Sequence, residues 1–512
     1  MDGGSLSDRP RVAVIGTGIG GLSAAARLAH AGLSVTLFER QAQIGGKMRV
    51  VPSAAGPVDT GPTVLTLRAE FDRLFADLGA RLSDYVDLVP LPVLARHFWP
   101  DGSRLDLFDD IDTSARAIEA FAGRHARRDY LRFRKKTARL FDAFEAPMMQ
   151  TAVPKPADLT RHVALRPWLV PAMAPMSTLA RRLARDFSDA RLAQLFGRYA
   201  TYVGGSPFQS PALLSLISEA EARGVWAPRG GMLALAHGVA QLATELGARI
   251  ICNAHVDEIM TSNDRVIGLR SGADIFPADA ILFNGDPRAL ALGHLGAAVA
   301  DEAPLTRTDA RSLSANVWAF SATPQGADLA HHNVFFSADP AWEWRSLDAG
   351  HWPEDPTIYV CAQDRAEGAP DGPERFELIL NAPPLTRRTP EPEDYKTCHR
   401  QTFQTLARHG LTFDPPPGPE ALTMPQEWEA RFPGSDGSLY GQSPHGMMAA
   451  FRRPTARAAM KGLYLAGGGA HPGAGVPMAT RSGRLAAEAM IADLSSTSMS
   501  RPTAMRGGMS TG

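Results

Sequence analysis

Three glycines near the start of the chain have a spacing that binds phosphate groups. Gly16, Gly18 and Gly21 form a G-x-G-x-x-G pattern between the apolar run Val12–Ile15 and an alanine-rich stretch that ends at His30. Such glycines allow a tight turn, a close approach of backbone to a pyrophosphate, and close packing of a helix on a strand. The phosphates then lie at the helix N-terminus. This segment is therefore predicted to bind a dinucleotide.

Glu39 indicates which kind of dinucleotide is bound. It follows a second apolar strand, Ser34–Phe38, roughly 20 residues after the glycines, where a carboxylate accepts hydrogen bonds from the hydroxyls of an adenosine ribose. This charge would repel a 2′-phosphate, although the neighbouring Arg40 weakens the repulsion. We therefore expect FAD or NAD rather than NADP.

No other motif predicts a catalytic group. The sequence has no G-x-S-x-G or H-E-x-x-H motif and no cluster of metal ligands, and Cys252, Cys361 and Cys398 form no C-x-x-C pair. We therefore expect no metal, and we name no catalytic residue. A second complete dinucleotide motif is also missing, so electrons are expected to leave by a route other than NAD(P)H.

The composition is that of a globular protein. The 512 residues carry a formal net charge of −1 and are 44% hydrophobic, which argues against a nucleic-acid partner. The acidic N-terminus does not resemble a secretory signal, and no run of about 18 apolar residues could span a membrane. We expect a cytoplasmic protein.

Six segments spread over nearly the whole chain resemble one family. They are the first glycine motif with Glu39, IGGKM, DTGPT, ADAILFNGDP, SLYGQSPHG and GLYLAGGGAHPGAGVPMATRSG. Together they resemble the bacterial carotenoid desaturase branch of the flavin-dependent amine-oxidase-like superfamily. The stretch His471–Gly483 is more similar to the 1-hydroxycarotenoid 3,4-desaturases, also called methoxyneurosporene dehydrogenases, than to phytoene desaturases, which read HPGAGIPG. The resemblance implies bound FAD and a hydrophobic channel for a polyene.

The resemblance also implies roles for individual residues. Gly16, Gly18, Gly21 and Glu39 would hold the diphosphate and the adenosine ribose, and Lys47 would meet the diphosphate. The other implied FAD-site residues are Thr63, Val64, Val256, Asn284, Leu439, Gly468, Gly475, Val476 and Met478, with Val256 at the adenine and Met478 at the flavin ring. His471 is expected to fix its loop rather than to act as a base.

The predicted fold is α/β, with a Rossmann-type FAD-binding domain, an antiparallel-sheet substrate domain and an inserted helical region. Periodicity and turn residues give the expected boundaries. The FAD-binding parts are 11–115, 228–309 and 434–494, the helical region is 116–227, the substrate domain is 310–433, and 495–512 is a disordered tail.

The activity implied by the resemblance is desaturation of a carotenoid in carotenoid biosynthesis. The enzyme would introduce the C-3,4 double bond into acyclic 1-hydroxy or 1-methoxy carotenoids, with a flavin as hydride acceptor and quinone or oxygen as the final electron acceptor. Three alternatives stay open. They are a phytoene desaturase, an FAD oxidase of another apolar substrate such as a porphyrinogen, and a flavin-free escort protein for isoprenoid-modified partners.

Two groups of side chains in the helical region predict contact with a membrane surface. The apolar group is Trp168, Leu169, Val170, Met173 and Met176, and the basic group is Arg181, Arg182 and Arg185. An interfacial helix combines these two faces. A core helix with a solvated arginine face is the alternative. Because carotenoids dissolve in lipid, we expect the protein to associate peripherally with the inner membrane.

Overall fold

The first glycine motif folds as the predicted strand, helix and strand at the centre of a parallel sheet. The computed structural model describes residues 9–499. The last four residues of β1 (Arg11–Ile15) are buried, which is typical of a strand covered on both faces. The five parallel strands run in the order β20 (Leu463–Leu465), β13 (Ala280–Phe283), β1, β2 (Ser34–Phe38) and β9 (Arg249–Ile251). The sheet is thus assembled from distant parts of the chain.

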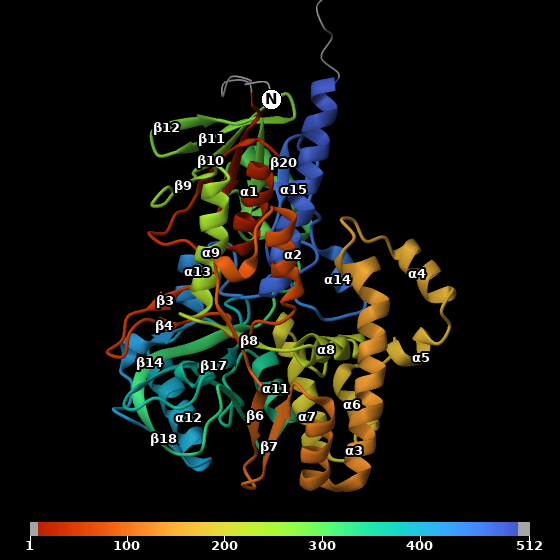
Figure 1. The fold of residues 1–512 in the computed structure, drawn as a ribbon. Coiled ribbons are helices and arrows are strands. Elements are labelled where there is room, and N and C mark those ends of the chain that lie inside the picture. The colour runs from red at the N-terminus through yellow and green to blue at the C-terminus, as the bar shows by residue number, and fades with distance from the viewer. Residues whose placement is uncertain (1–8, 500–512) are drawn as a thin grey trace, which may run out of the picture.

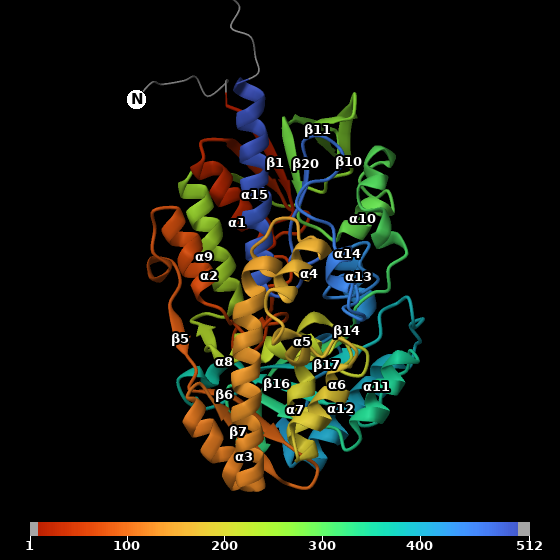
Figure 2. The same cartoon turned by 90° about the vertical axis from the view of Figure 1, so that its right-hand side faces the viewer.

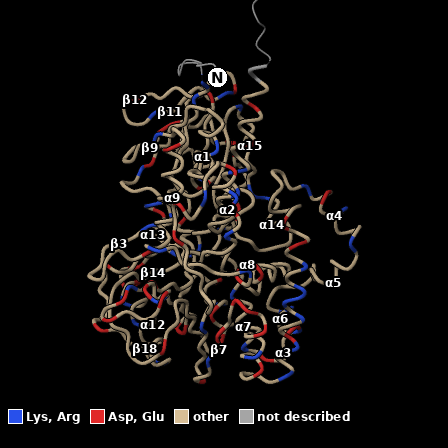
Figure 3. The backbone as a smooth tube through the Cα atoms, in the orientation of Figure 1, with Lys and Arg blue, Asp and Glu red and all other residues tan. Residues whose placement is uncertain are grey.

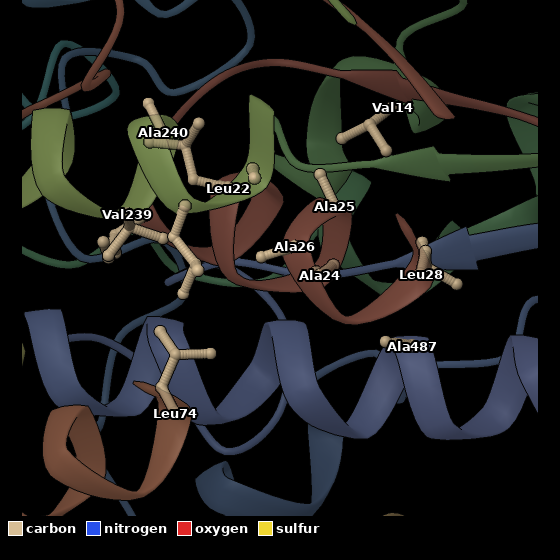
Figure 4. Close-up of a cluster of buried hydrophobic side chains, with 14 of the residues drawn as sticks. Val14, Leu22, Ala24, Ala25, Ala26, Leu28, Leu74, Val239, Ala240 and Ala487 are labelled. Atoms are coloured by element: carbon tan, nitrogen blue, oxygen red, sulfur yellow. The ribbon is translucent and has the colours of Figure 1, made fainter. Parts of the chain in front are cut away.

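Helix α1 (Ile19–His30) is enclosed by other helices. It lies between α9 (Met232–Glu245) and α15 (Val476–Met499), with α2 (Ala69–Asp77) beside them (Figure 4). Ala24, Ala25 and Ala26 have no exposed surface, because small side chains let the neighbouring helices approach closely. A helix that is apolar on all sides is stable only when buried in this way.

A second, larger sheet lies at the other end of the molecule (Figure 1). It is antiparallel except where β15 pairs with β6. Its order is β18 (Leu411–Asp414), β14 (Ser314–Gly326), β17 (Glu374–Ala382), β16 (Ile358–Ala362), β15 (His332–Phe335), β6 (Val93–Phe98) and β7 (Arg104–Phe108), with β19 (Leu422–Thr423) on β14. The hairpin β6–β7 lies inside the range 11–115, so that part of the chain contributes to both sheets.

The helical region begins at α3, five residues before the expected boundary at 116. Gly123 has a φ of 85° and kinks this long helix. The helices are α3 (Ile111–Phe144), α4 (Pro156–Ala164), α5 (Leu169–Met173), α6 (Leu179–Asp186), α7 (Ala190–Gly197) and α8 (Ile217–Ala222). In Figure 1, α4 and α5 project from the body of the molecule.

Shorter elements complete the fold. The remaining strands are β3 (Val50–Val51), β4 (Val58–Asp59), β5 (Leu88–Pro90), β8 (Trp226–Pro228), and the antiparallel trio β10 (Glu258–Ser262), β11 (Arg265–Ser271) and β12 (Asp274–Pro277). The other helices are α10 (Pro287–Ala291), α11 (Pro340–Asp348), α12 (Asp394–Arg408), α13 (Pro425–Arg431) and α14 (Ala449–Arg452). The helical region also contains the π turn η3 (Glu145–Met149) and the 3-10 turns η4 (Arg198–Val203) and η5 (Ala212–Leu216). The predicted α/β class, with a parallel and an antiparallel-rich sheet, is confirmed.

The C-terminal helix corrects one expected boundary. α15 continues to Met499, so 495–499 are helical rather than a disordered tail, and 500–512 lie outside the described residues. Within 9–499, no helix combines the length and apolar character that crossing a bilayer requires.

Replacing Gly483 by Ala tests the close crossing of α1 and α15. A Cβ atom at Gly483 would lie 2.1 Å from the carbonyl oxygen of Gly20, so the helices would have to separate. Overpacking of this kind costs about 2 kcal/mol, and we expect a lower urea midpoint of unfolding. Gly197→Ala in α7 is the matched control, because its Cβ would meet atoms only at 3.6 Å or more. Equal midpoints for the two variants would contradict this packing.

Candidate cofactor and substrate site

A cavity of about 700 Å³ extends between the two sheets. Its cofactor end is formed by the first glycine turn, the turn Gly45–Gly46 and the loop Gly467–Gly469. Its other end is formed by residues of β15, β16 and β17 and by residues of α6 and α7. The cavity therefore brings the predicted nucleotide motif against the predicted substrate domain.

The structure places nearly all of the predicted FAD-site residues at this cavity. The residues that line it are Gly16, Gly18, Glu39, Lys47, Thr63, Val64, Val256, Asn284, Leu439, Gly468, Gly475 and Val476. Gly21 does not line it, because its α-carbon packs against the glycine turn, where a Cβ would lie 2.3 Å from the Gly16 carbonyl oxygen. Met478 does not line it either. Val476 and Pro477 occupy the wall there instead.

The N-terminus of α1 is open to an anion. Gly18 is the N-cap residue, no side chain caps the helix, and its first turn contains no acidic residue. The first N–H groups of a helix have no partner within the helix, and the helix dipole is positive at this end. Gly46 lies close to this turn, as is shown by the position of a Cβ atom built on it, which would be 3.0 Å from the Gly18 α-carbon. The backbone therefore offers donors that suit a diphosphate.

Glu39 is a fixed carboxylate at the end of β2. It is 5% exposed. Its Oε2 accepts hydrogen bonds from the Thr17 backbone N–H at 3.0 Å and from the Thr17 hydroxyl at 2.7 Å, and its Oε1 accepts one from the Gln41 N–H at 2.9 Å. A carboxylate has about four acceptor positions, so capacity remains for a ribose hydroxyl.

Lys47 places a positive charge in the wall of the cavity. Its Nζ donates to the Leu439 carbonyl oxygen at 2.5 Å, and burial lowers the pKa of the ammonium to about 8. Asp286 only partly offsets this desolvation. A buried ammonium bonded to a neutral carbonyl gains stability from an anionic ligand. Lys47, Glu39 and the open end of α1 thus fit the diphosphate and ribose of FAD.

Two further side chains fix the loops of the cofactor end. Asn284 Nδ2 donates to the carbonyl oxygens of Gly16 and Gly18, at 3.3 Å each, so this amide supports the glycine turn. His471 Nε2 donates to the Thr151 carbonyl oxygen at 2.8 Å, and burial lowers the pKa of its imidazole. A neutral, hydrogen-bonded His471 agrees with the predicted loop-fixing role.

The opposite wall contains polar side chains for which the sequence offers no motif. Tyr359 lies on β16, Tyr202 and Arg198 on η4, and Gln194 on α7, and all four line the cavity. Behind the lining residue Gly61, the Glu377 carboxyl accepts a hydrogen bond from the Gly61 N–H at 2.6 Å, and burial raises the pKa of Glu377 well above its usual range. These residues become neighbours only through the tertiary fold, so local spacing carried no signal for them.

Comparison with known proteins gives three findings. The family described as flavin containing amine oxidoreductase matches residues 19–491. A hydroxyneurosporene desaturase of Cereibacter sphaeroides is 52% identical over 96% of this chain and 99% of its own length. One of Rubrivivax gelatinosus is 42% identical over 98% of this chain and 97% of its own.

Solved structures support the same fold. Cyclohexylamine oxidase from Brevibacterium oxydans superimposes with a TM-score of 0.56 at 17% identity, covering 95% of this chain and 100% of that chain. At this identity the likeness concerns the fold alone. The two proteins therefore share the same overall fold.

Replacing Lys47 by Met tests the anion site. The variant loses a charged hydrogen bond, so we expect FAD to bind about 10- to 100-fold more weakly at pH 7. In the wild-type protein the affinity should fall as the pH rises above about 8, where the free ammonium loses its proton, and this dependence should vanish in Lys47→Met. Fluorescence titration of the apoprotein with FAD measures both effects.

The control for this experiment is Lys396→Met, since the Lys396 side chain is 73% exposed on α12. Equal FAD affinity in Lys47→Met and Lys396→Met would contradict a role of Lys47 in binding the FAD diphosphate.

Proposed function

Because the chain belongs to the flavin-containing amine oxidoreductase family, within its carotenoid desaturase branch, we propose that it is a C-3,4 desaturase of acyclic carotenoids. Its substrate carries a 1-hydroxy or 1-methoxy group, and its cofactor is FAD. The observation that carries this proposal is the full-length similarity, at 42–52% identity, to proteins named hydroxyneurosporene desaturase.

The cavity supports a polyene substrate. Beyond the cofactor end its wall is built largely from apolar side chains, which are Ala180, Ala184, Ala193, Val317, Val334, Phe336 and Ile379. Such a wall excludes water and contacts a rigid hydrocarbon along its whole length. One C–H bond of the substrate is therefore held next to the cofactor in a fixed orientation. When bound, FAD supplies the acceptor for the hydride. The chain supplies orientation and a dry environment.

An exposed apolar surface next to the cavity supports uptake of substrate from lipid. Leu165, Trp168 and Met176 are 72%, 46% and 92% exposed, on the α4–α5 segment that faces the viewer in Figure 2. Phe208 is 40% exposed and also lines the cavity. The Arg182 guanidinium donates to the Pro171 carbonyl oxygen at 2.9 Å, so α5 lies against α6, whose Ala180 and Ala184 line the cavity.

The structure divides the two side-chain groups that suggested membrane contact. Leu169 and Met173 are buried, at 0% and 7% exposure, and therefore belong to the core. Arg182 Nε donates to Asp186 at 3.0 Å, so its charge is already paired. Arg181 and Arg185 are exposed on α6. Figure 3 colours the basic positions along the chain blue. We propose contact with an anionic bilayer through these arginines and the exposed apolar surface, with a quinone of that bilayer or oxygen as electron acceptor.

The substrate proposal predicts the product of a reconstituted reaction. FAD-loaded protein is incubated with liposomes that contain a quinone and either 1-hydroxyneurosporene or phytoene, and the extracted pigment is examined by absorption spectroscopy. We expect a red shift only with the hydroxylated substrate, because one double bond is added to its conjugated system. Colour formed from phytoene would instead favour a phytoene desaturase. No shift with either substrate would contradict carotenoid desaturation.

The membrane proposal predicts that negative charges introduced into the exposed apolar surface weaken the binding of the protein to liposomes. The double variant Trp168→Glu, Met176→Glu should bind anionic liposomes at least about 10-fold more weakly in a flotation assay, since carboxylates oppose insertion. Ile275→Glu is the matched control, because Ile275 is 59% exposed on β12 at the other end of the molecule. Equal liposome binding by the double variant and by Ile275→Glu would show that the α4–α5 segment is not the membrane contact.

A further inference from the structure

A row of hydrogen bonds leads from the cavity into the second sheet. The Tyr359 hydroxyl lies 2.7 Å from the Thr63 hydroxyl and 2.7 Å from His332 Nδ1. Thr63 and Tyr359 line the cavity, whereas His332, on the neighbouring strand β15, is 1% exposed. The phenol therefore has the cavity on one side and an imidazole on the other. Thr63 follows the turn Gly61–Pro62, which also lines the cavity.

Desaturation requires a group that accepts a proton. One carbon loses a hydride, and the adjacent carbon must lose a proton so that the electron pair of its C–H bond forms the new double bond. We propose that Tyr359 accepts this proton on its hydroxyl oxygen and passes its own phenolic proton to His332 Nδ1. FAD is the oxidant and receives the hydride, so two electrons leave the carotenoid and one proton is stored on His332. This inference rests on the proposed function.

The protonation states of the two residues suit this transfer. Burial lowers the pKa of His332 well below its usual range, so its imidazole is neutral and Nδ1 has a free lone pair. Burial raises the pKa of Tyr359 well above its usual range, so the phenol does not act as an anion and needs an acceptor behind it. A carbocation conjugated with a polyene is a much stronger acid than a buried imidazolium. The proton transfer is therefore favourable.

The surrounding groups make storage of the proton temporary. Arg198 is positively charged and lowers the pKa of His332 further, as does His331, whose Nε2 lies 3.6 Å from Cys361 Sγ. Cys361, Glu377 and Tyr202 are the other titratable groups that face Tyr359, and burial raises the pKa of each of them. Because burial disfavours the charged imidazole, the imidazolium returns its proton through the Tyr359 hydroxyl to solvent that enters the cavity once the carotenoid product leaves.

Other polar residues of the cavity wall are less suited to this role. The Tyr202 hydroxyl donates to Glu221, but the same carboxylate accepts from Tyr199 at 2.6 Å and is paired with Arg198. The Glu221 oxygens are therefore already engaged by three donors. Glu343 accepts hydrogen bonds from Ser337 and Thr357, and so its oxygens are engaged as well. The neutral base behind Tyr359 distinguishes it from these residues.

The test separates proton transfer from hydride transfer. FAD-loaded protein is mixed anaerobically with 1-hydroxyneurosporene, and the loss of oxidised-flavin absorbance is followed by stopped flow in a single turnover. Because hydride transfer to the flavin is reversible until the adjacent carbon loses its proton, net flavin reduction in Tyr359→Phe should fall at least about 100-fold, as is typical when a general base is removed. A substrate deuterated at C-3 should show a larger isotope effect than in the wild type, because proton loss becomes limiting. FAD content and carotenoid affinity should stay unchanged.

A second variant and a control complete the experiment. His332→Leu keeps the phenol and removes the base, and it should slow flavin reduction without adding to the effect of Tyr359→Phe in the double variant. Tyr199→Phe is the control, since Tyr199 is another buried phenol but does not line the cavity, and it should react at about the wild-type rate. The wild-type rate should be constant between about pH 6 and pH 9.

Either of two results would overturn the proposal. The first is a rate within about 3-fold of wild type in both Tyr359→Phe and His332→Leu. The second is an unchanged C-3 isotope effect in both variants. A wild-type protein that oxidises no hydroxylated carotenoid, in this assay and in the liposome assay alike, would overturn the proposed function as well.

Discussion

The cofactor end of the cavity depends on how the backbone packs around the side chain of Asn284. Its Nδ2 holds the carbonyl oxygens of Gly16 and Gly18. A Cβ atom on Gly20 or on Gly467 would lie 2.6 Å or 2.7 Å from its Oδ1. One amide thus joins β13, the first glycine turn and the C-terminal loop, and only glycines leave enough space for it. The open end of α1 faces the cavity because this packing holds it there.

Buried ion pairs attach the helical region to this centre. Arg481 on α15 is 1% exposed, and its guanidinium donates to Glu70 on α2 at 2.9 Å and to Glu145 at the end of α3 at 3.0 Å. A buried charge is tolerated only in a geometry that provides such partners, so this contact favours one arrangement of the three helices. Together with the bond from His471 to Thr151, it connects the loop at the cofactor end with the segment that leads to α4 and α5.

The parts of the structure that could be predicted are those specified by local sequence. The last residue of α1 and both ends of β2 were predicted correctly, because alanines, glycines and alternating apolar residues define these elements within a few positions. The pairing of β6 with β15 could not be predicted, since the paired residues are more than 200 positions apart in the sequence. The sequence of the hairpin β6–β7 also does not indicate which of the two sheets it joins. Tyr359 and His332 were missed for the same reason.

The parallel sheet also constrains when the protein can fold during synthesis. Val12 on β1 pairs with Ala280 on β13, and Ile281 pairs with Leu463 on β20. At roughly 5–20 residues per second, the ribosome needs about 13 to 54 seconds to supply the first partner and about two-thirds of that time for the second. β2 follows β1 almost at once, but the other edge of the apolar β1 has no partner until β13 has been translated, and β13 in turn waits for β20.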